Sequence, residues 1–407
     1  MFWSGGRAYT QAALIERVVE EFLLEYGASG PANGLLREAA TSTARLKLIR
    51  DVLDYVLGVE SIQVSLDDRA ALIRAIYAEL FGYGPLDPLF ADESVTSVVL
   101  AGDRHVAVRY GHADLTPISP LFQDESHLEM VMDRLLADAG VNIDGRDIVY
   151  EAGLRVGERR VRLSVTAPPV TPVLYADFRL HPTIRPSLSD LHTAGWMTDE
   201  ACDVIERMAK SGYGFAIVGE PETGKTTLLN ALLPLFGGGG TVLERAGELL
   251  PPDGVVHIGP GLSEPPEGAI SFGDWVDGTA ASAGSFLALD EIRGEEPESV
   301  APLLGLQDPP RLIWSVRGVP DAKRLQSAMG MLARRAAPDE GEDAVRALYR
   351  RLPFVISLAR IRGRLQVFSI AEWQSRADSD YPDYVMLFRY NEGAARPTDA
   401  ILARWLD

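Results

Sequence analysis

A glycine-rich segment near the middle of the 407-residue chain restricts the possible fold more than any other feature of the sequence. It lies between a short apolar run, 215–218, and a helical pattern over 226–235, and reads Gly219-Glu220-Pro221-Glu222-Thr223-Gly224-Lys225-Thr226-Thr227. Glycines at this spacing between a strand and a helix let successive backbone N–H groups turn toward phosphate oxygens, and the helix adds its positive end. In this arrangement Lys225 reaches the β- and γ-phosphates of a nucleotide and Thr226 binds Mg²⁺. We therefore expect residues 219–227 to bind a nucleoside triphosphate.

Two acidic residues inside this loop, Glu220 and Glu222, are unusual beside phosphates. Each negative charge weakens the positive potential of the loop unless the side chain turns outward.

A second motif consists of an apolar run that ends in two acids, Phe286-Leu287-Ala288-Leu289-Asp290-Glu291. Next to a phosphate loop, Asp290 is expected to hold the hydration shell of Mg²⁺, and Glu291 to orient or deprotonate the attacking water. The alternative is a strand that ends in two solvated acids. A third segment, 243–249, places Glu244 and Glu248 after another apolar run, where a carboxylate can share the catalytic water or can simply face solvent on a loop.

The pattern along the chain predicts an α/β protein with distinct parts. Residues 1–60 carry two amphipathic helical patterns and form a helical module, and residues 61–188 mix helices with short β-branched runs, which is typical of an α+β domain. Residues 182–190 have the composition of a linker. In residues 195–407, strands alternate with helices, which predicts a mostly parallel sheet, and the last strands form hairpins around a polar loop at 378–382. The expected strands of this sheet are 215–218, 241–243, 255–258, 286–289, 312–314 and 355–358.

Composition narrows the classes of partner. The net charge is −19 and the sequence pI is about 4.8, so we expect no general affinity for nucleic acid or anionic lipid. The single cysteine, Cys202, excludes an internal disulfide and a Cys-only zinc site, and favours a reducing, cytoplasmic setting. No apolar run reaches the about 18 residues that a membrane span needs. The six histidines show no ligand spacing, and we expect them to have surface or packing roles.

On these motifs the chain resembles the type II/type IV secretion ATPases, and is most similar to the branch that powers assembly of Tad/Flp pili. The resemblance covers roughly residues 75–375 and is carried by the phosphate loop, 95–99, 141–144, 162–169, 291–296, 369–373, and the run Gly82-Tyr83-Gly84-Pro85-Leu86-Asp87-Pro88-Leu89. It implies a RecA-like ATPase domain that follows a smaller, PAS-like α+β domain. It also implies that Arg179 of the smaller domain reaches the nucleotide and that ATP and Mg²⁺ are the cofactors. The motor it implies is a ring of six copies that acts on a membrane partner. That partner would be the inner-membrane platform protein of a pilus or secretion system, with the motor at the inner face of the membrane.

The sequence departs from this family in groups that complete the reaction. Where the family has Glu-Asp, this chain has Glu244-Arg245, and where the family has a histidine motif, residues 315–318 contain no histidine. Gly153 stands where the family has an arginine, and the Arg-Pro-Asp stretch of the family is replaced by other residues within 281–285. Loss of a charge-stabilising group in phosphoryl transfer costs on the order of 10³–10⁵ in rate. Three hypotheses follow: an ATP-driven assembly motor, a slow or non-hydrolysing nucleotide-binding regulator or scaffold of the same machinery, and a DNA-translocating motor, which the charge of −19 disfavours.

Overall fold

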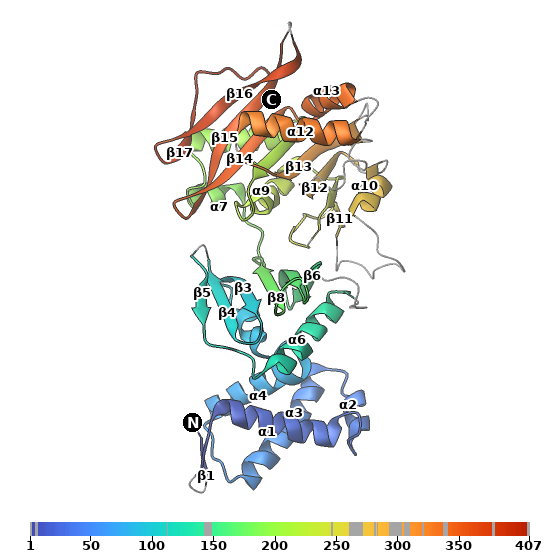
Figure 1. The fold of residues 1–407 in the computed structure, drawn as a ribbon, viewed down its shortest axis with the longest axis vertical. Helices are drawn as coiled ribbons and strands as arrows, with labels where there is room; N and C mark the ends of the chain where they lie inside the picture. The colour runs from blue at the N-terminus through green and yellow to red at the C-terminus, as the bar shows by residue number, and fades with distance from the viewer. Residues whose placement is uncertain are drawn as a thin grey trace.

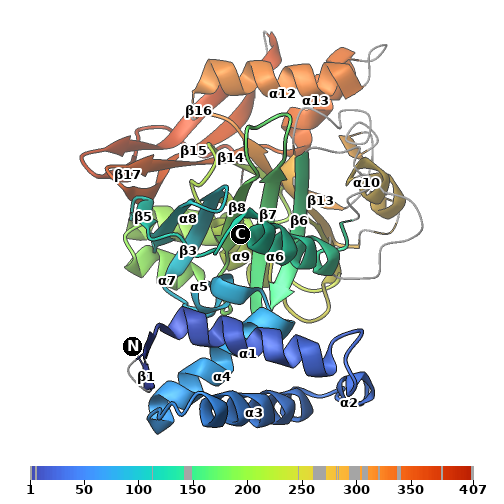
Figure 2. The ribbon, with the colours of Figure 1, turned by 60° about the horizontal axis from the view of Figure 1, so that its bottom comes forward.

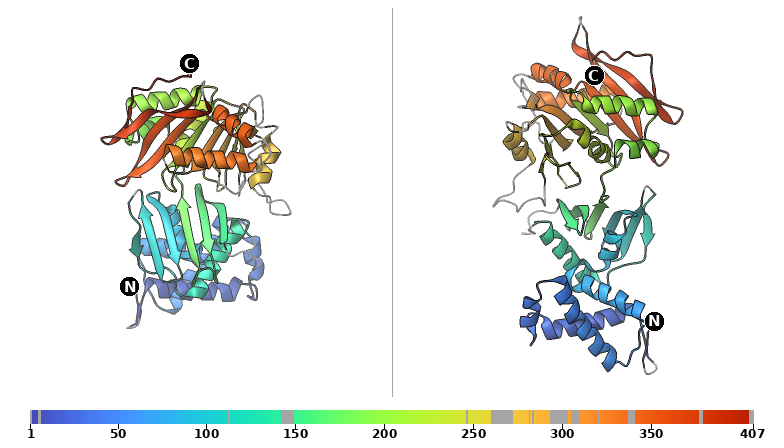
Figure 3. Two further views of the ribbon diagram at one scale, coloured as in Figure 1. Left: turned by 45° about the horizontal axis from the view of Figure 1, so that its top comes forward. Right: turned by 180° about the vertical axis from the view of Figure 1, so that it is seen from behind.

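The computed structural model describes every residue except 1, 5–6, 112, 142–148, 246, 260–271, 281, 283, 293–302, 305–309, 320, 337–340, 377–378 and 405–407. A helical module lies at one end of the long axis, a six-stranded sheet lies in the middle, and a larger sheet flanked by helices lies at the other end (Figures 1 and 3). The prediction of a mixed α/β protein is therefore confirmed.

The N-terminal module packs helices around one apolar core. Its elements are β1 (Phe2–Ser4), β2 (Arg7–Tyr9), α1 (Gln11–Tyr26), α2 (Asn33–Glu38), α3 (Ser42–Val59) and α4 (Leu66–Phe81). Thr10, Thr41 and Ser65 cap the three long helices by accepting hydrogen bonds from backbone N–H groups in their first turns. Helix α4, which lies within the predicted α+β domain, contributes Leu72 and Ile76 to the same core as α1 and α3.

The middle part is an antiparallel sheet with helices packed on one face. Its elements are η1 (Gly84–Leu86), α5 (Asp87–Ala91), β3 (Val95–Ala101), β4 (His105–Tyr110), β5 (Thr116–Ile118), α6 (Glu125–Asp138), β6 (Val149–Val156), β7 (Arg159–Thr166) and β8 (Tyr175–Leu180), with strand order β5-β4-β3-β8-β7-β6. Figure 2 shows α6 in front of the strands β6 and β7. Side chains alternate along β7, so Val161, Leu163 and Val165 pack in the core with α6 while Arg160 and Arg162 lie on the other face. That second face is turned toward the larger sheet.

The C-terminal part has a nine-stranded sheet in the order β11-β10-β12-β13-β9-β14-β15-β16-β17. Its elements are α7 (Leu188–Thr193), α8 (Asp199–Lys210), β9 (Phe215–Gly219), α9 (Lys225–Leu232), η2 (Leu233–Phe236), β10 (Thr241–Leu243), β11 (Val256–Ile258), α10 (Phe272–Ala280), β12 (Phe286–Ile292), β13 (Arg311–Arg317), α12 (Ala322–Ala336), α13 (Gly341–Arg351), β14 (Phe354–Ile361), β15 (Arg364–Arg376), β16 (Ser379–Asn391) and β17 (Ala394–Pro397). The strands from β11 to β14 are parallel, and β15–β17 extend the sheet in antiparallel fashion.

Apolar residues cover both faces of this sheet, as expected for parallel strands between two layers of helices. In β9, Phe215 and Ile217 pack with α7, α8 and α9, whereas Ala216 and Val218 pack with α10, α12 and α13. Successive side chains of this apolar strand point to opposite faces, so both faces of the sheet are covered by helices.

Two local predictions were wrong. Residues 187–190 are not a linker, because Ser187 and Asp190 form a reciprocal capping box that begins α7. The predicted polar loop at 378–382 is largely part of β16, which begins at Ser379 and pairs with β15. Among the described residues, no helix combines the length and apolar composition needed to cross a membrane.

One buried arginine fixes the start of β7 against the beginning of the sheet. Arg159 is 5% exposed and donates hydrogen bonds to the carbonyl oxygens of Phe90 at 3.1 Å, Asp92 and His181.

We predict that Arg159→Met lowers the free energy of unfolding by about 1–3 kcal/mol, because buried carbonyl groups lose their donors. The control Arg155→Met removes a guanidinium that is 55% exposed on the neighbouring strand, with an expected effect within about 0.5 kcal/mol. Urea unfolding measures both, and equal losses for the two variants would contradict this role.

Candidate functional site

The phosphate loop predicted from the sequence connects β9 to α9. Gly224 is the N-cap of α9 and has a φ of 86°, in the left-handed region that favours glycine. A Cβ atom at this position would lie 2.3 Å from the ring of Trp196, so close packing also requires glycine here. Lys225 begins the helix, and its ammonium group donates a hydrogen bond to the Glu220 carbonyl at 3.0 Å. The loop has the geometry of an anion-binding turn at the positive end of a helix.

A chain of hydrogen bonds joins this loop to the acidic end of β12. Thr226 Oγ1 donates to Asp290 Oδ2 at 2.9 Å, and Ser315 Oγ on β13 donates to Asp290 Oδ1 at 2.5 Å. The Ser315 hydroxyl also accepts the backbone N–H of Glu291 at 2.8 Å. Glu291 has a φ of 58°, and Arg245 donates to its carbonyl at 3.2 Å, so its backbone is held on both sides in a rarely adopted conformation. This network fixes the orientations of the Asp290 side chain and of the Glu291 backbone near the end of β12.

Burial shifts the protonation of the groups beside the loop. The pKa of Asp290 is raised to about 7, first by burial and then by the negative charge of Glu248, although the hydrogen bond from Ser315 opposes the shift. Burial lowers the pKa of Lys225, and the negative charge of Glu291 opposes it. A divalent cation next to Asp290 would favour the carboxylate form of that residue.

The opposite wall of the site is one rung of the middle sheet. Ser97 on β3 pairs with Arg109 on β4 and with Arg179 on β8, and Arg179 pairs in turn with Arg162 on β7. Side chains of residues paired across neighbouring strands share a face of the sheet, and these lie on the face opposite the apolar core. We call Arg109, Arg179 and Arg162 the arginine rung. Gly153 on β6, where the resemblance implies an arginine, pairs with Arg162 and continues the same rung.

Two members of the arginine rung hold Glu222 of the phosphate loop. Arg109 Nη1 lies 2.7 Å from Glu222 Oε2, and Arg179 Nη2 lies 3.3 Å from Glu222 Oε1. Burial acts to raise the pKa of the Glu222 carboxyl, but the hydrogen bond from Arg109 and the charge of Arg179 outweigh it and lower the pKa. The side chain therefore turns away from the loop interior and pairs with the other domain.

The third member of the rung, Arg162, lies between two acids of the C-terminal part. Its guanidinium is 3.3 Å from Glu248 Oε1 and 3.5 Å from Glu291 Oε2, and it also contacts Glu151 of β6. His181 Nε2 is 3.3 Å from the same oxygen of Glu248. Burial acts to raise the pKa of Glu248, but the charges of His181 and Arg162 lower it far below its ordinary value. Glu248 is thus held as a carboxylate.

Glu244 has a different environment, with its carboxylate inside the protein. It is 0% exposed and accepts backbone N–H groups of Glu248 and of Leu249, the latter at 2.9 Å. It also contacts His257, and Arg160 lies 3.7 Å away. These bonds hold the segment that presents Glu248 to the arginine rung.

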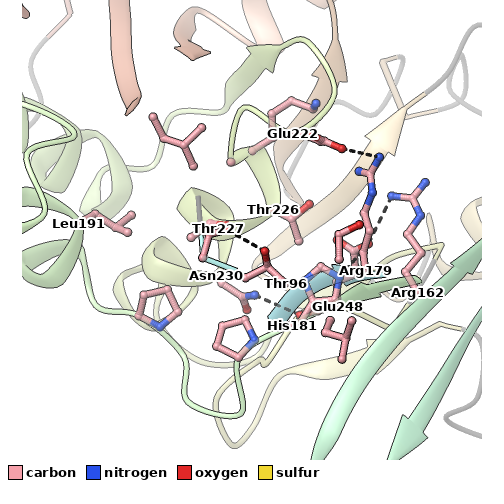
Figure 4. Close-up of a pocket in the computed structure, with 18 of the residues that line it drawn as sticks. Thr96, Arg162, Arg179, His181, Leu191, Glu222, Thr226, Thr227, Asn230 and Glu248 are labelled. Carbon is pink, nitrogen blue, oxygen red and sulfur yellow. Dashed lines mark hydrogen bonds and ion pairs between the residues drawn. The ribbon is translucent and has the colours of Figure 1, made fainter. Parts of the chain in front are cut away.

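A cavity of about 660 Å³ lies between the loop and the arginine rung, a size typical of small-molecule sites (Figure 4). Thr226 and Thr227 line one side, and Arg162, Arg179 and His181 line the side formed by the middle sheet. Apolar side chains line another part of the cavity: Pro182, Ile184, Pro186, Leu191, Trp196 and Leu365.

These residues fit a magnesium nucleotide. Lys225, the arginine rung and the N-terminus of α9 suit phosphates, and the apolar wall suits a base. The described residues contain no group of three or more His, Cys, Asp or Glu arranged to hold a metal. Mg²⁺ beside phosphates needs few protein ligands, and the adjacent Thr226 and Asp290 suit that role.

The sequence matches curated proteins over part of its length. A Mycobacterium tuberculosis protein named for conjugal transfer is 30% identical over 167 residues, which cover 40% of this chain and 47% of that protein. An uncharacterised Methanocaldococcus jannaschii protein is 22% identical over 239 residues, 58% of this chain and 43% of that protein. The chain spans about half the length of these curated relatives. No protein-family model matches the sequence.

Among solved structures, the Legionella pneumophila ATPase DotB aligns with a TM-score of 0.51 and 17% sequence identity, covering 72% of this chain and 81% of that chain. The chain has the fold of this ATPase. The VirB11 ATPase of the Brucella suis type IV secretion system aligns over 75% of this chain and 96% of that chain, with a TM-score of 0.36 and 18% identity.

The structure brings most of the predicted site residues to one cavity. Its lining includes Pro221, Glu222, Gly224, Lys225, Thr226, Thr227, Arg179, Glu248 and Glu291. Asp290 lies behind Thr226, Glu244 lies behind Glu248, and Gly219, Glu220 and Thr223 complete the loop. The quoted motif residues 142–144 and 293–296 lie outside the described residues.

Sequence reasoning missed several residues of this site. The sequence predicted surface or packing roles for all histidines and did not indicate that His181 and His257 contact Glu248 and Glu244. Ser315 and Arg245, which the sequence did not single out as site residues, both hold the backbone of Glu291. The alternation of arginine with apolar residues in 159–165 was the available signal for Arg162.

We predict that Glu244→Ala lowers the free energy of unfolding by about 1–3 kcal/mol, because two buried N–H groups lose their acceptor. The control Asp253→Ala removes an exposed carboxylate on the same connection, with an expected effect within about 0.5 kcal/mol. Denaturant unfolding of both variants tests this, and an unchanged Glu244→Ala would show that the carboxylate does not hold the segment.

Proposed function

We propose that the chain is an ATP-binding and ATP-hydrolysing motor of the type II/type IV secretion ATPase family, in the Tad/Flp branch that powers pilus assembly. One observation supports this most strongly. The phosphate loop is bonded through Thr226 to Asp290, beside Glu291, and the arginine rung of a second domain lines the same cavity. The motifs of the sequence and the DotB-like fold agree with this arrangement.

In this proposal residues 219–227 hold the phosphates, and Thr226 and Asp290 hold Mg²⁺. A bound nucleotide would supply the phosphoryl group, and Mg²⁺ held by Thr226 and Asp290 would neutralise the negative charge that develops on it. Lys225 and Arg179 approach the phosphates from opposite walls of the cavity. Their positive charges act on the phosphates between those walls, where little water screens them.

Glu291 is the proposed residue that accepts a proton from the attacking water. Its backbone is fixed by Ser315 and Arg245, so its carboxylate is held in a defined direction. Glu248, ionised and paired with Arg162, keeps that arginine between the two acids. Glu244 acts behind Glu248 by holding its backbone N–H.

The work of such a motor would come from domain movement. The ion pairs to Glu222, Glu248 and Glu291 join residues 61–188 to residues 195–407. In this proposal the helical module at 1–60 moves together with residues 61–188. We propose a ring of six copies in the cytoplasm that contacts an inner-membrane platform protein.

The net charge of −19 argues against a nucleic-acid cargo, whereas the relative named for conjugal transfer raises that possibility. A DNA-binding titration at several salt concentrations separates a protein-assembly motor from a DNA-translocating motor. We expect no DNA binding.

The alternative is a slow or non-hydrolysing nucleotide-binding regulator or scaffold of the same machinery. It is favoured by Glu244, whose carboxylate is occupied by backbone N–H groups and His257 rather than open to the cavity. Tight ATP binding without turnover would support it.

We predict that the chain with Mg²⁺ and ATP releases phosphate, that Lys225→Ala abolishes both binding and release, and that Glu291→Gln keeps binding. The Glu291→Gln rate should fall by about 10²- to 10⁴-fold, the contribution of a positioned general base. Calorimetry and phosphate release measure the two steps separately. Release no higher than that of Lys225→Ala, even with membrane partners present, would exclude the motor and leave the regulator.

We also predict that nucleotide assembles the chain into a ring. Mass photometry with a non-hydrolysable ATP analogue should show a species of six times 44.3 kDa, and Lys225→Ala should not form it. The 44.3 kDa species alone under both conditions would contradict a nucleotide-assembled hexamer.

A further inference from the structure

Glu222 lies at the middle of the phosphate loop, yet both of its carboxylate oxygens contact arginines of the middle sheet. Its two carboxylate oxygens take Arg109 at 2.7 Å and Arg179 at 3.3 Å, and its backbone carbonyl accepts Arg360 Nη2 at 3.3 Å. Its φ of 63° is in the left-handed region, which is unfavourable for a side chain of this size. Three arginines therefore contact Glu222, whose backbone has the unfavourable left-handed conformation.

The register of the middle sheet explains why two arginines meet one carboxylate. Arg109 and Arg179 both pair with Ser97, from opposite sides, so they lie on one rung and one face. Their side chains are 19% and 30% exposed, and that of Glu222 is 35% exposed. The pairs are therefore partly shielded from water, but close enough to the surface to exchange partners.

The same two arginines line the cavity that contains Lys225 and Thr226. Burial lowers the pKa of Lys225, and the positive charge of Arg179 adds to that effect, so the two cations lie close to one another. A phosphate oxygen and a carboxylate oxygen are alternative partners for a guanidinium. A ligand phosphate that extends from the loop toward the rung must compete with Glu222 for Arg109 and Arg179.

We propose that Glu222 sets the preference of the site between nucleoside triphosphates and diphosphates. The inference rests on the proposed function. A diphosphate bound to the loop leaves the pairs of Glu222 with Arg109 and Arg179 intact. The third phosphate of a triphosphate recruits these arginines and must displace the carboxylate, so Glu222 weakens triphosphate binding selectively and couples it to a change at the domain interface.

The test is calorimetry of the full chain with Mg²⁺ and either ADP or a non-hydrolysable ATP analogue. Glu222→Gln removes the charge and keeps the side-chain shape. Glu220→Gln, the matched control, removes the same charge from the same loop at an exposed position and measures the general electrostatic effect. Glu222→Gly, which adopts positive φ freely, is a second variant that also relieves the backbone.

We expect both Glu222 variants to bind the ATP analogue more tightly than Glu220→Gln does, by about fivefold or more, with equal ADP affinities. Equal gains for Glu222→Gln and Glu220→Gln, or equal gains for the two nucleotides, would overturn the inference while leaving the proposed function intact. If neither the native chain nor any variant binds either nucleotide, the proposed function and this inference both fail.

Discussion

Ion pairs across the interdomain cavity are the interaction on which the rest of the structure depends. Glu222, Glu248 and Glu291 of the C-terminal part each contact an arginine of the middle sheet. Several acids around one cavity repel one another and lose hydration, which is costly unless opposite charges compensate them. The arginine rung supplies that compensation from the middle sheet. Residues of the middle sheet and of the C-terminal part therefore line one cavity together.

This dependence has a consequence for nucleotide binding. Phosphates would bring further negative charge to a cavity whose arginines already have carboxylate partners, so ligand binding must rearrange ion pairs as well as form contacts. Such an exchange converts the chemical state of the ligand into a change at the domain interface, which is what a motor or a regulator needs. Ser315 and Arg245 belong to the same site, because both fix the backbone of Glu291.

The sequence was sufficient for features that short segments determine. The glycine-rich turn after β9, the apolar strand β12 that carries Asp290, and the mostly parallel strands of the large sheet follow from local spacing and alternation. The arginine rung does not, because it depends on the register of β4, β3, β8 and β7, and β8 was not recognised as a strand at all. His181 and His257 were assigned surface or packing roles for the same reason, since their acidic partners are distant in sequence. The start of α7 was missed although Ser187 and Asp190 carry a local capping signal.

The central claim is that a nucleotide binds between the loop at 219–227 and the arginine rung. A structure of the full chain with Mg²⁺ and a non-hydrolysable ATP analogue tests it most directly. The phosphates should lie at Gly224, Lys225 and Thr226, with Arg109 or Arg179 moved from Glu222 to a phosphate oxygen. A nucleotide outside this cavity, or one whose phosphates contact no arginine of the middle sheet, would contradict the account.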